Sequence, residues 1–199
     1  MAPREQILDA AARLFTGSGF AATSTREIAD EVGIRQASLY YHFAGKDEIL
    51  GELLEKTVRP TLDSLDDLAQ VAGPEARLYT LAYRDAQVLA ELPHNIGALP
   101  THPDVTSTDV CDEYQAARQQ LRRAYGALAA ACASDAVNGS ISQRQLGELI
   151  IQQVEGVVRT RAADNDVTPM ELHAVAATCL RICGVPEDRA KEATRTCVL

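Results

Sequence analysis

A short polar and aromatic segment contains the side chains with the clearest chemistry in this chain. Residues 36–43 have the sequence Gln-Ala-Ser-Leu-Tyr-Tyr-His-Phe. If Leu39 and Phe43, spaced four residues apart, anchor a helix to a core, the side chains between them are exposed. A phenol can lie against a thymine methyl or bind a phosphate, and Gln36 can read adenine in the major groove. Two adjacent tyrosines that met only water would be unfavourable, so the pattern indicates a surface that contacts DNA.

Groups that can bind phosphate lie on either side of this segment. Thr25 and Arg26 begin one predicted helix, and Lys46 begins another. Free backbone N–H groups at a helix N-terminus and a nearby cation both favour a phosphate. The alternative is structural, because Tyr40 and His42 can instead pack against neighbouring helices.

A helix-turn-helix is needed to position these side chains, and the sequence contains its signals. Ser24, with Glu27 three residues later, forms a capping box before a helix over residues 25–32. Gly33 permits the positive φ of a tight turn, and a second helix follows over residues 36–43. A short helix, a turn with glycine and a second helix are typical of one class of DNA-binding proteins.

Nearly every other segment has the apolar period of a helix, and no segment alternates long enough to predict a strand. Proline and glycine mark the ends of the helices, and two further capping boxes, Ser142 with Gln145 and Thr168 with Glu171, mark where helices begin. Further helices are predicted over residues 3–18, 46–70, 74–92, 109–133, 142–161, 169–183 and 187–196, with a short one near Asp104. The proline-rich residues 93–103 forbid a continuous helix, and residues 134–141 are predicted as a loop. The fold class predicted is all-α, with nine or ten helices.

Five motifs in residues 1–50 carry a family resemblance. They are Ile7-Leu-Asp-Ala-Ala, Phe15 with Gly19-Phe20, Thr25-Arg-Glu-Ile-Ala, Val32-Gly-Ile, and Ser38-Leu-Tyr-Tyr-His-Phe-Ala-Gly-Lys-Asp-Glu-Ile-Leu50. Together they resemble the DNA-binding region of the TetR family of bacterial transcriptional regulators, over about a quarter of the chain. The resemblance implies a three-helix DNA-binding domain with a helix-turn-helix, residues 1–47. A larger helical domain for effector binding and dimerisation, residues 48–199, is expected to follow.

By this resemblance, a set of positions matches those where family members contact DNA: Thr25, Arg26, Gln36, Ala37, Ser38, Tyr40, Tyr41, His42 and Lys46. Arg35 departs from the pattern, because the family often has Ser or Thr at this position. The change removes a usual N-cap and adds a cation, so Arg35 either contacts a phosphate or a guanine or remains a solvated charge. Residues 1–50 carry five basic and seven acidic side chains, so DNA affinity must come from a few well-placed cations.

Two apolar stripes near the C-terminal end must be buried, and the family resemblance implies that they form a dimer interface. Its residues are Leu146, Ile150, Val154, Val157 and Val158 on the first helix, and Leu172, Val175, Ala176 and Cys179 on the second. In the TetR family such a pair of helices meets its copy in a four-helix bundle. The alternative is that both helices pack only within one subunit. A dimer would place two recognition helices about 34–36 Å apart on a palindromic site.

The resemblance also implies a pocket for a small-molecule effector in the larger domain. The side chains predicted to line it are Tyr79, Tyr83, Tyr114, Tyr125 and Gln152, and each can alternatively belong to the core or the surface. His94, His102 and Asp104 lack regular ligand spacing, so no metal site and no cofactor are predicted. The five cysteines, among them Cys111 and Cys197, can form a redox sensor, but buried and unreactive thiols are the simpler expectation.

Composition excludes several classes of protein. The 199 residues are 46% hydrophobic and 24% charged, as in ordinary globular proteins. A net charge of −9 argues against a chain that coats nucleic acid but permits a small DNA-binding face. The longest apolar run is too short for a membrane span, and no signal-peptide pattern precedes the first helix. The cysteines show no CxxC spacing and suit a reducing compartment, so a cytoplasmic, nucleoid-associated location is predicted.

These observations predict a ligand-responsive transcriptional regulator. We expect a repressor that binds a palindromic operator as a homodimer and is released by a small-molecule effector. The alternative is an effector-independent architectural or dimerisation protein that binds DNA. No catalytic-triad order, HExxH motif, glycine-rich phosphate loop or spaced carboxylate pair is present, so an enzyme is not predicted.

Overall fold

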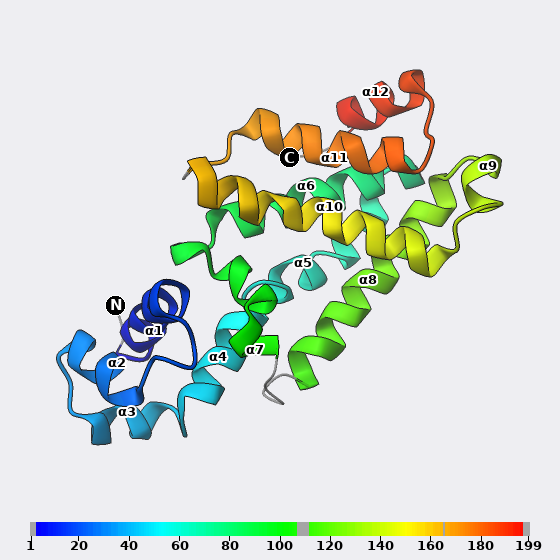
Figure 1. The fold of residues 1–199 in the computed structure, drawn as a ribbon. Coiled ribbons are helices and arrows are strands. Elements are labelled where there is room, and N and C mark those ends of the chain that lie inside the picture. The colour runs from blue at the N-terminus through cyan, green and yellow to red at the C-terminus, as the bar shows by residue number, and fades with distance from the viewer. Residues whose placement is uncertain (1–2, 107–111, 165, 197–199) are drawn as a thin grey trace. The chain divides into compact units, whose positions relative to one another are not determined.

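The computed structural model describes residues 3–106, 112–164 and 166–196, and every regular element in these ranges is a helix (Figure 1). The predicted all-α class is confirmed. The described residues contain more helices than predicted because short ones occur where loops or longer helices were expected. These short helices are Arg59–Asp63 (α5), Asp66–Gln70 (η1, a 3-10 helix), Pro93–Thr101 (η2, also 3-10) and Asp135–Asn138 (α9).

Packing divides the chain into two compact units. The N-terminal unit comprises residues 1–57 and 92–115, and the C-terminal unit comprises residues 58–91 and 116–199. The boundary predicted after residue 47 concerns where DNA-binding function ends, and it stays a prediction. The two units are defined by contacts within the chain. By this criterion, residues 92–115 belong to the same unit as the N-terminal helices.

Four helices form the first part of the N-terminal unit: Pro3–Ser18 (α1), Thr25–Val32 (α2), Gln36–His42 (α3) and Lys46–Glu55 (α4). Their core contains fully buried side chains from each helix, among them Phe15, Ile28, Leu39 and Leu50. Predicted apolar positions at spacings of three and four residues are therefore the buried ones.

The proline-rich segment packs against this core. Its η2 contacts α1 and α4, and Ile96 and Leu99 are buried there. His94 Nε2 lies 2.9 Å from the carboxylate of Asp9 on α1. The short helix Pro103–Thr106 (α7) follows, and Asp104 accepts a 3.4 Å hydrogen bond from the backbone N–H of Ala21. The segment therefore supports the helices that carry the predicted DNA contacts.

The predicted helix over residues 46–70 is wrong in its length. It ends at Glu55, and the chain turns before α5 begins at Arg59. Pro60 explains the break, because a proline in a continuous helix would lose its hydrogen bond to Lys56 and clash with that carbonyl. The chain instead uses Pro60 in the first turn of α5, where no N–H is needed.

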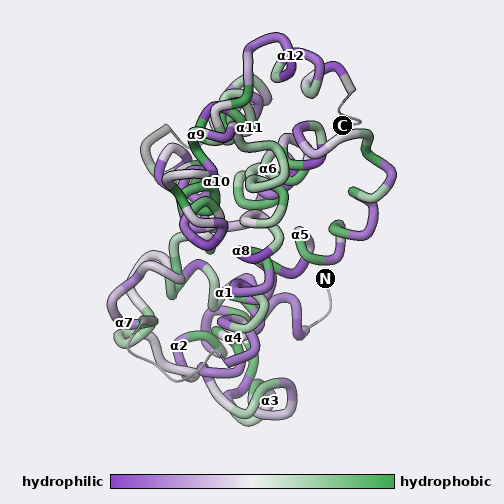
Figure 2. The backbone as a smooth tube through the Cα atoms, turned by 90° about the vertical axis from the view of Figure 1, so that its right-hand side faces the viewer, coloured by the Kyte–Doolittle hydropathy of each residue, from purple (hydrophilic) through white to green (hydrophobic). Residues whose placement is uncertain are grey.

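The C-terminal unit is built around Pro74–Glu91 (α6), Asp112–Cys132 (α8, from residue 116), Gln143–Asp164 (α10) and Pro169–Ile182 (α11). Both α10 and α11 pack on α6, and Figure 1 shows them side by side. Glu187–Thr196 (α12) also packs on α6, and Figure 2 shows mainly hydrophilic residues along it. Residues 109–111, where the α8 helix was predicted to begin, lie outside the described residues.

All three predicted capping boxes are confirmed, and they fix where helices begin. Ser24 with Glu27 and Thr168 with Glu171 each exchange side-chain and backbone hydrogen bonds at the starts of α2 and α11. Ser142 and Gln145 do the same at the start of α10. Each box satisfies N–H groups that lack a partner within the first helical turn.

The residues predicted for the dimer interface face the core of the single chain, and their contact with a second copy stays a prediction. Among Leu146, Ile150, Val154, Val157, Val158, Leu172, Ala176 and Cys179, none exposes more than 7%, and only Val175 is half-buried. The apolar stripes are covered because α10 and α11 pack against α6 and against each other. Within one chain, these two helices leave their opposite faces to solvent.

A carboxylate lies in the core of the C-terminal unit. Asp85 on α6 is 2% exposed, and its two oxygens accept hydrogen bonds from Tyr125 at 2.6 Å and Thr61 at 2.8 Å. Burial raises the pKa of Asp85 to about 6, although both hydrogen bonds act in the opposite direction. A buried polar group of this kind needs such partners, because an unpaired one is costly.

Because the pKa of Asp85 differs between the folded and the unfolded chain, its contribution to the free energy of unfolding depends on pH. The pKa in the folded state lies above its ordinary value of 3.8, so the folded chain binds more protons than the unfolded chain between about pH 4 and pH 6. This group's contribution to stability therefore decreases as pH rises through that window. In Asp85→Asn the side chain cannot ionise, so the contribution is absent.

We expect the free energy of unfolding of Asp85→Asn, relative to the unsubstituted chain, to increase by about 2 kcal/mol between pH 4 and pH 7. Urea denaturation at a series of pH values measures it, and other carboxylates cancel in the comparison. A difference that stays constant over this range would show that Asp85 does not titrate as its environment implies.

Candidate nucleic-acid interface

The helix α3 is held against the N-terminal unit by one side. Leu39 and Phe43 are 0% and 1% exposed, so the predicted anchors are confirmed. Gly33 has a φ of 76°, and the backbone N–H of Ile34 donates to the carbonyl of Ala29 at 2.9 Å, which closes the tight turn. Only a glycine adopts this φ at little cost. These contacts leave the other side of α3 to solvent.

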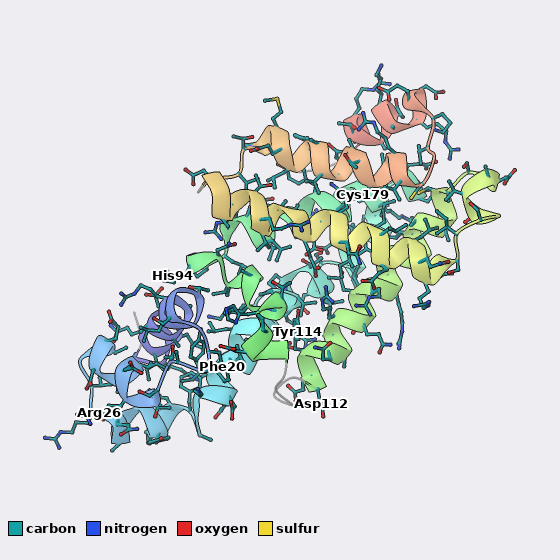
Figure 3. All side chains as sticks on the ribbon, in the orientation of Figure 1. Phe20, Arg26, His94, Asp112, Tyr114 and Cys179 are labelled. Carbon is teal, nitrogen blue, oxygen red and sulfur yellow. The ribbon has the colours of Figure 1, made fainter. Side chains whose placement is uncertain are left out.

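The structure places all ten predicted DNA contacts at the surface of the N-terminal unit or close to it. Thr25, His42 and Lys46 are half-buried, and Arg26, Arg35, Gln36, Ala37, Ser38, Tyr40 and Tyr41 are exposed. Tyr41 exposes 87% of its surface and Tyr40 exposes 50%, which is unusual for aromatic side chains. Figure 3 shows Arg26 extending away from the ribbon into solvent.

A hydrogen-bonded group joins the starts of the two helices. The Gln36 amide nitrogen donates to the hydroxyl of Thr25 at 2.9 Å, and the same hydroxyl lies 3.1 Å from the phenol of Tyr40. Because the amide nitrogen is engaged, the orientation of the Gln36 amide is fixed, and its oxygen and second N–H remain free. A bidentate contact with adenine requires one amide oxygen and one N–H, which this orientation of Gln36 leaves free. Thr25 is thus placed to orient the Gln36 amide, whose contact with a base stays a prediction.

Lys46 is tied to the protein rather than directed into solvent. Its ammonium donates to the carbonyls of Phe20 at 2.8 Å and Thr23 at 3.0 Å. It also lies 4.4 Å from the centre of the Phe20 ring, within range of a cation–π contact. The structure therefore gives Lys46 a role that sequence reasoning missed: it joins the loop before α2 to the start of α4. Its predicted phosphate contact stays a prediction.

The cations near α3 differ in how they are paired. Arg26 lies 3.8 Å from Asp30, and Arg13 forms an ion pair with Glu31. Arg35, the N-cap residue of α3, makes no side-chain cap hydrogen bond and has no ion pair among the described residues. The sequence predicted that Arg35 would not cap the helix, and this is confirmed. Its guanidinium is available to an anion.

The predicted effector-binding residues are divided between the two units, and their role in binding an effector stays a prediction. Tyr79, Tyr83 and Tyr125 are buried in the C-terminal unit, whereas Tyr114 is buried in the N-terminal unit. Gln152 is exposed and donates to Glu148 on the same helix. Tyr79 and Tyr83 both contact His173, whose Nδ1 lies 2.5 Å from the Tyr79 hydroxyl. Tyr125 instead binds Asp85.

Asp85 and His173 are polar groups that sequence reasoning missed. The signal for Asp85 was present, because it continues the apolar register of Leu78, Ala82 and Leu89 along α6. A carboxylate at a core position needs partners, and here they come from α5 and α8. The ion pair between Arg118 and Glu155, 2.5 Å apart, is close enough to influence the pKa of Asp85.

The remaining candidates are the potential metal ligands and the cysteines. No group of three potential ligands is close enough to hold a metal ion in the described ranges. Cys132, Cys179 and Cys183 are buried, and burial raises the pKa of Cys179 to about 12, which disfavours the reactive thiolate. Cys111 and Cys197 lie outside the described residues. In those ranges, too, no helix has the length and apolar character needed to cross a membrane.

An anchored short helix with an exposed polar and aromatic face, joined through a glycine turn to a capped helix, defines a helix-turn-helix regulator. Residues 7–53 match the model of the family described as bacterial regulatory proteins, tetR family. The crystal structure of AmtR from Mycobacterium smegmatis is similar over 98% of this chain and 92% of its own, with 40% identity and a TM-score of 0.83. The chain belongs to the TetR family of bacterial transcriptional regulators, whose members are not enzymes.

Other relatives are similar over smaller regions or at lower identity. The transcriptional repressor KstR2 of Mycobacterium tuberculosis H37Rv is 49% identical over 83 residues, which are 39% of this chain and 40% of the repressor. The chain thus matches less than half the length of this curated relative. The structure of AibR in complex with isovaleryl coenzyme A and operator DNA has a TM-score of 0.74 over 93% of this chain and 100% of its own. At 16% identity, it shows a common fold only.

The hydrogen bonds of Thr25 predict a specificity effect. In Thr25→Val the side chain keeps its shape but loses the hydroxyl, so the Gln36 amide is no longer held. We expect binding to the best DNA site to weaken about five- to tenfold and the preference at one base pair to relax. Thr25→Ser, which keeps the hydroxyl, should behave as the unsubstituted chain. Binding assays over all single-base variants of the site measure both. An equal loss on every sequence would instead indicate a direct phosphate contact.

The carbonyl contacts of Lys46 predict a stability effect. Lys46→Met keeps the length of the side chain but removes the ammonium, which donates hydrogen bonds to three loop carbonyls. We expect a loss of about 1.5–3 kcal/mol in the free energy of unfolding, measured with urea. The salt dependence of DNA binding should keep its slope. A slope reduced by about one would contradict the structural role and indicate that the ammonium neutralises a phosphate.

Proposed function

We propose that this regulator is a ligand-responsive repressor that binds a palindromic operator as a homodimer and is released by a small-molecule effector. The observation that carries the proposal is the exposed face of α3, where Gln36, Tyr40 and Tyr41 stand free of the core. A surface of this composition suits the major groove. A protein with this function acts at the nucleoid, in the cytoplasm.

Few cations support DNA binding, which favours a dimer. One seven-residue helix reads only a few base pairs, and two copies related by a twofold axis read a palindrome. The outward faces of α10 and α11 suit the second copy. Leu149 on α10 exposes 41% and Met170 on α11 exposes 78%, and both are large apolar side chains. Gln153, Gly156 and Thr160 continue the same face of α10.

The polar groups inside the C-terminal unit suit an effector. Asp85, Tyr125 and Thr61 form one cluster, and Tyr79, Tyr83 and His173 form another. Effector sites combine apolar walls with a few placed polar groups. The chain passes between the two units after residues 57, 91 and 115, so a shift in one unit has three covalent routes to the other. A coupling of about 1–3 kcal/mol would change operator affinity about 5–150-fold.

Selection of bound sequences from random duplex DNA tests the first half of the proposal. We expect an enriched palindrome with half-sites one helical turn apart or a multiple of it. Gln36→Ala and Tyr40→Ala should each weaken binding to that site by about 1–3 kcal/mol and relax its sequence preference. A purified chain that prefers no duplex over random competitor at moderate salt would overturn the proposal.

Release from the selected site by metabolites tests the second half. We expect at least one small molecule to lower operator affinity, and Asp85→Asn or His173→Ala to change the concentration required. The relatives support this expectation, because AibR is described in complex with isovaleryl coenzyme A and operator DNA. A chain that binds a palindrome and responds to no metabolite would favour the effector-independent architectural alternative.

A further inference from the structure

A groove on the C-terminal unit contains three arginines and belongs to none of the sites described above. It lies between α8 and the start of α10 and has a volume of about 460 Å³. Its lining residues are Gln119, Arg122, Arg123, Gly126, Gln143 and Arg144. None of them was predicted to contact DNA, an effector or a second subunit. All lie in one compact unit, so the groove is formed by that unit alone.

Two glycines bring the helices together at the groove. A Cβ atom on Gly147 of α10 would lie 2.4 Å from the backbone oxygen of Arg122. A Cβ atom on Gly126 of α8 would lie 2.6 Å from the backbone oxygen of Gln143. Any other residue at either position would force the backbones apart. This close approach puts arginines from both helices around one hollow.

The charge of the groove is only partly neutralised. The Arg122 Nε lies 2.7 Å from the carboxylate of Glu148. Arg123 and Arg144 are exposed, and neither has a hydrogen bond or an ion pair among the described residues. Adjacent guanidinium groups around a concave surface concentrate positive potential, although the whole chain has a net charge of −9. A bound anion would relieve this repulsion.

We propose that the groove binds a small anion carrying at least two carboxylate or phosphate groups. A guanidinium presents paired N–H donors that match a carboxylate or a phosphate, and two arginines hold two such groups better than one. The amides of Gln119 and Gln143 add neutral donors at the rim. The volume falls within the range of about 300–1,000 Å³ typical of small-molecule sites.

Isothermal titration calorimetry on the full chain at constant ionic strength tests this site. Citrate is the carboxylate probe and pyrophosphate is the phosphate probe, so the two arms distinguish the sources of charge. We expect at least one of them to bind one site per chain with a dissociation constant of about 1 mM or tighter. The double substitution Arg123→Gln with Arg144→Gln should weaken that binding at least about tenfold.

A matched control removes two charges elsewhere. Arg159 on α10 and Arg181 on α11 are exposed and do not line the groove, so Arg159→Gln with Arg181→Gln should leave binding within about twofold. No saturable binding of either anion, or equal weakening by both double variants, would overturn the proposal. The titration contains no DNA, so its outcome is separate from that of operator binding.

Discussion

The recognition surface depends on burying one side of a very short helix. A helix of seven residues is not stable in water on its own, because nucleating it costs more than its few hydrogen bonds return. Leu39 and Phe43 supply what is missing by packing into the core of the N-terminal unit. Because these anchors fix which side faces inward, they also determine that Gln36, Tyr40 and Tyr41 face outward.

Neighbouring side chains hold the predicted DNA-contacting face of this helix in place. Thr25 holds the Gln36 amide, and Lys46 ties the loop before α2 to the start of α4. The segment from η2 to α7 adds support from a distant part of the sequence, through Ile96 in the core and Asp104 at the loop. A surface prepared in this way loses less conformational freedom on binding, which favours specific contacts over a large basic patch.

The C-terminal unit combines an apolar helical core with polar groups that need explanation. Asp85 and half-buried His173 each find partners on other helices, and the buried carboxylate of Asp85 needs them. The groove lined by Arg123 and Arg144 is different, because these two cations lack partners among the described residues and face solvent. The C-terminal unit thus has two sets of polar groups. Asp85 and His173 suit recognition of an effector, and Arg123 and Arg144 suit binding of an anion.

The sequence by itself determined the local features: the capped starts of α2, α10 and α11, the glycine turn and the anchored face of α3. Each depends on residues a few positions apart, so spacing alone specifies it. Only the tertiary structure decided which helix covers each apolar stripe, and it placed Val154 in the core of the single chain. It also ended α4 at Glu55 and gave the ammonium of Lys46 to loop carbonyls. Periodicity identifies the face of a helix that must be buried, but the element that buries it is set by contacts between distant parts of the chain.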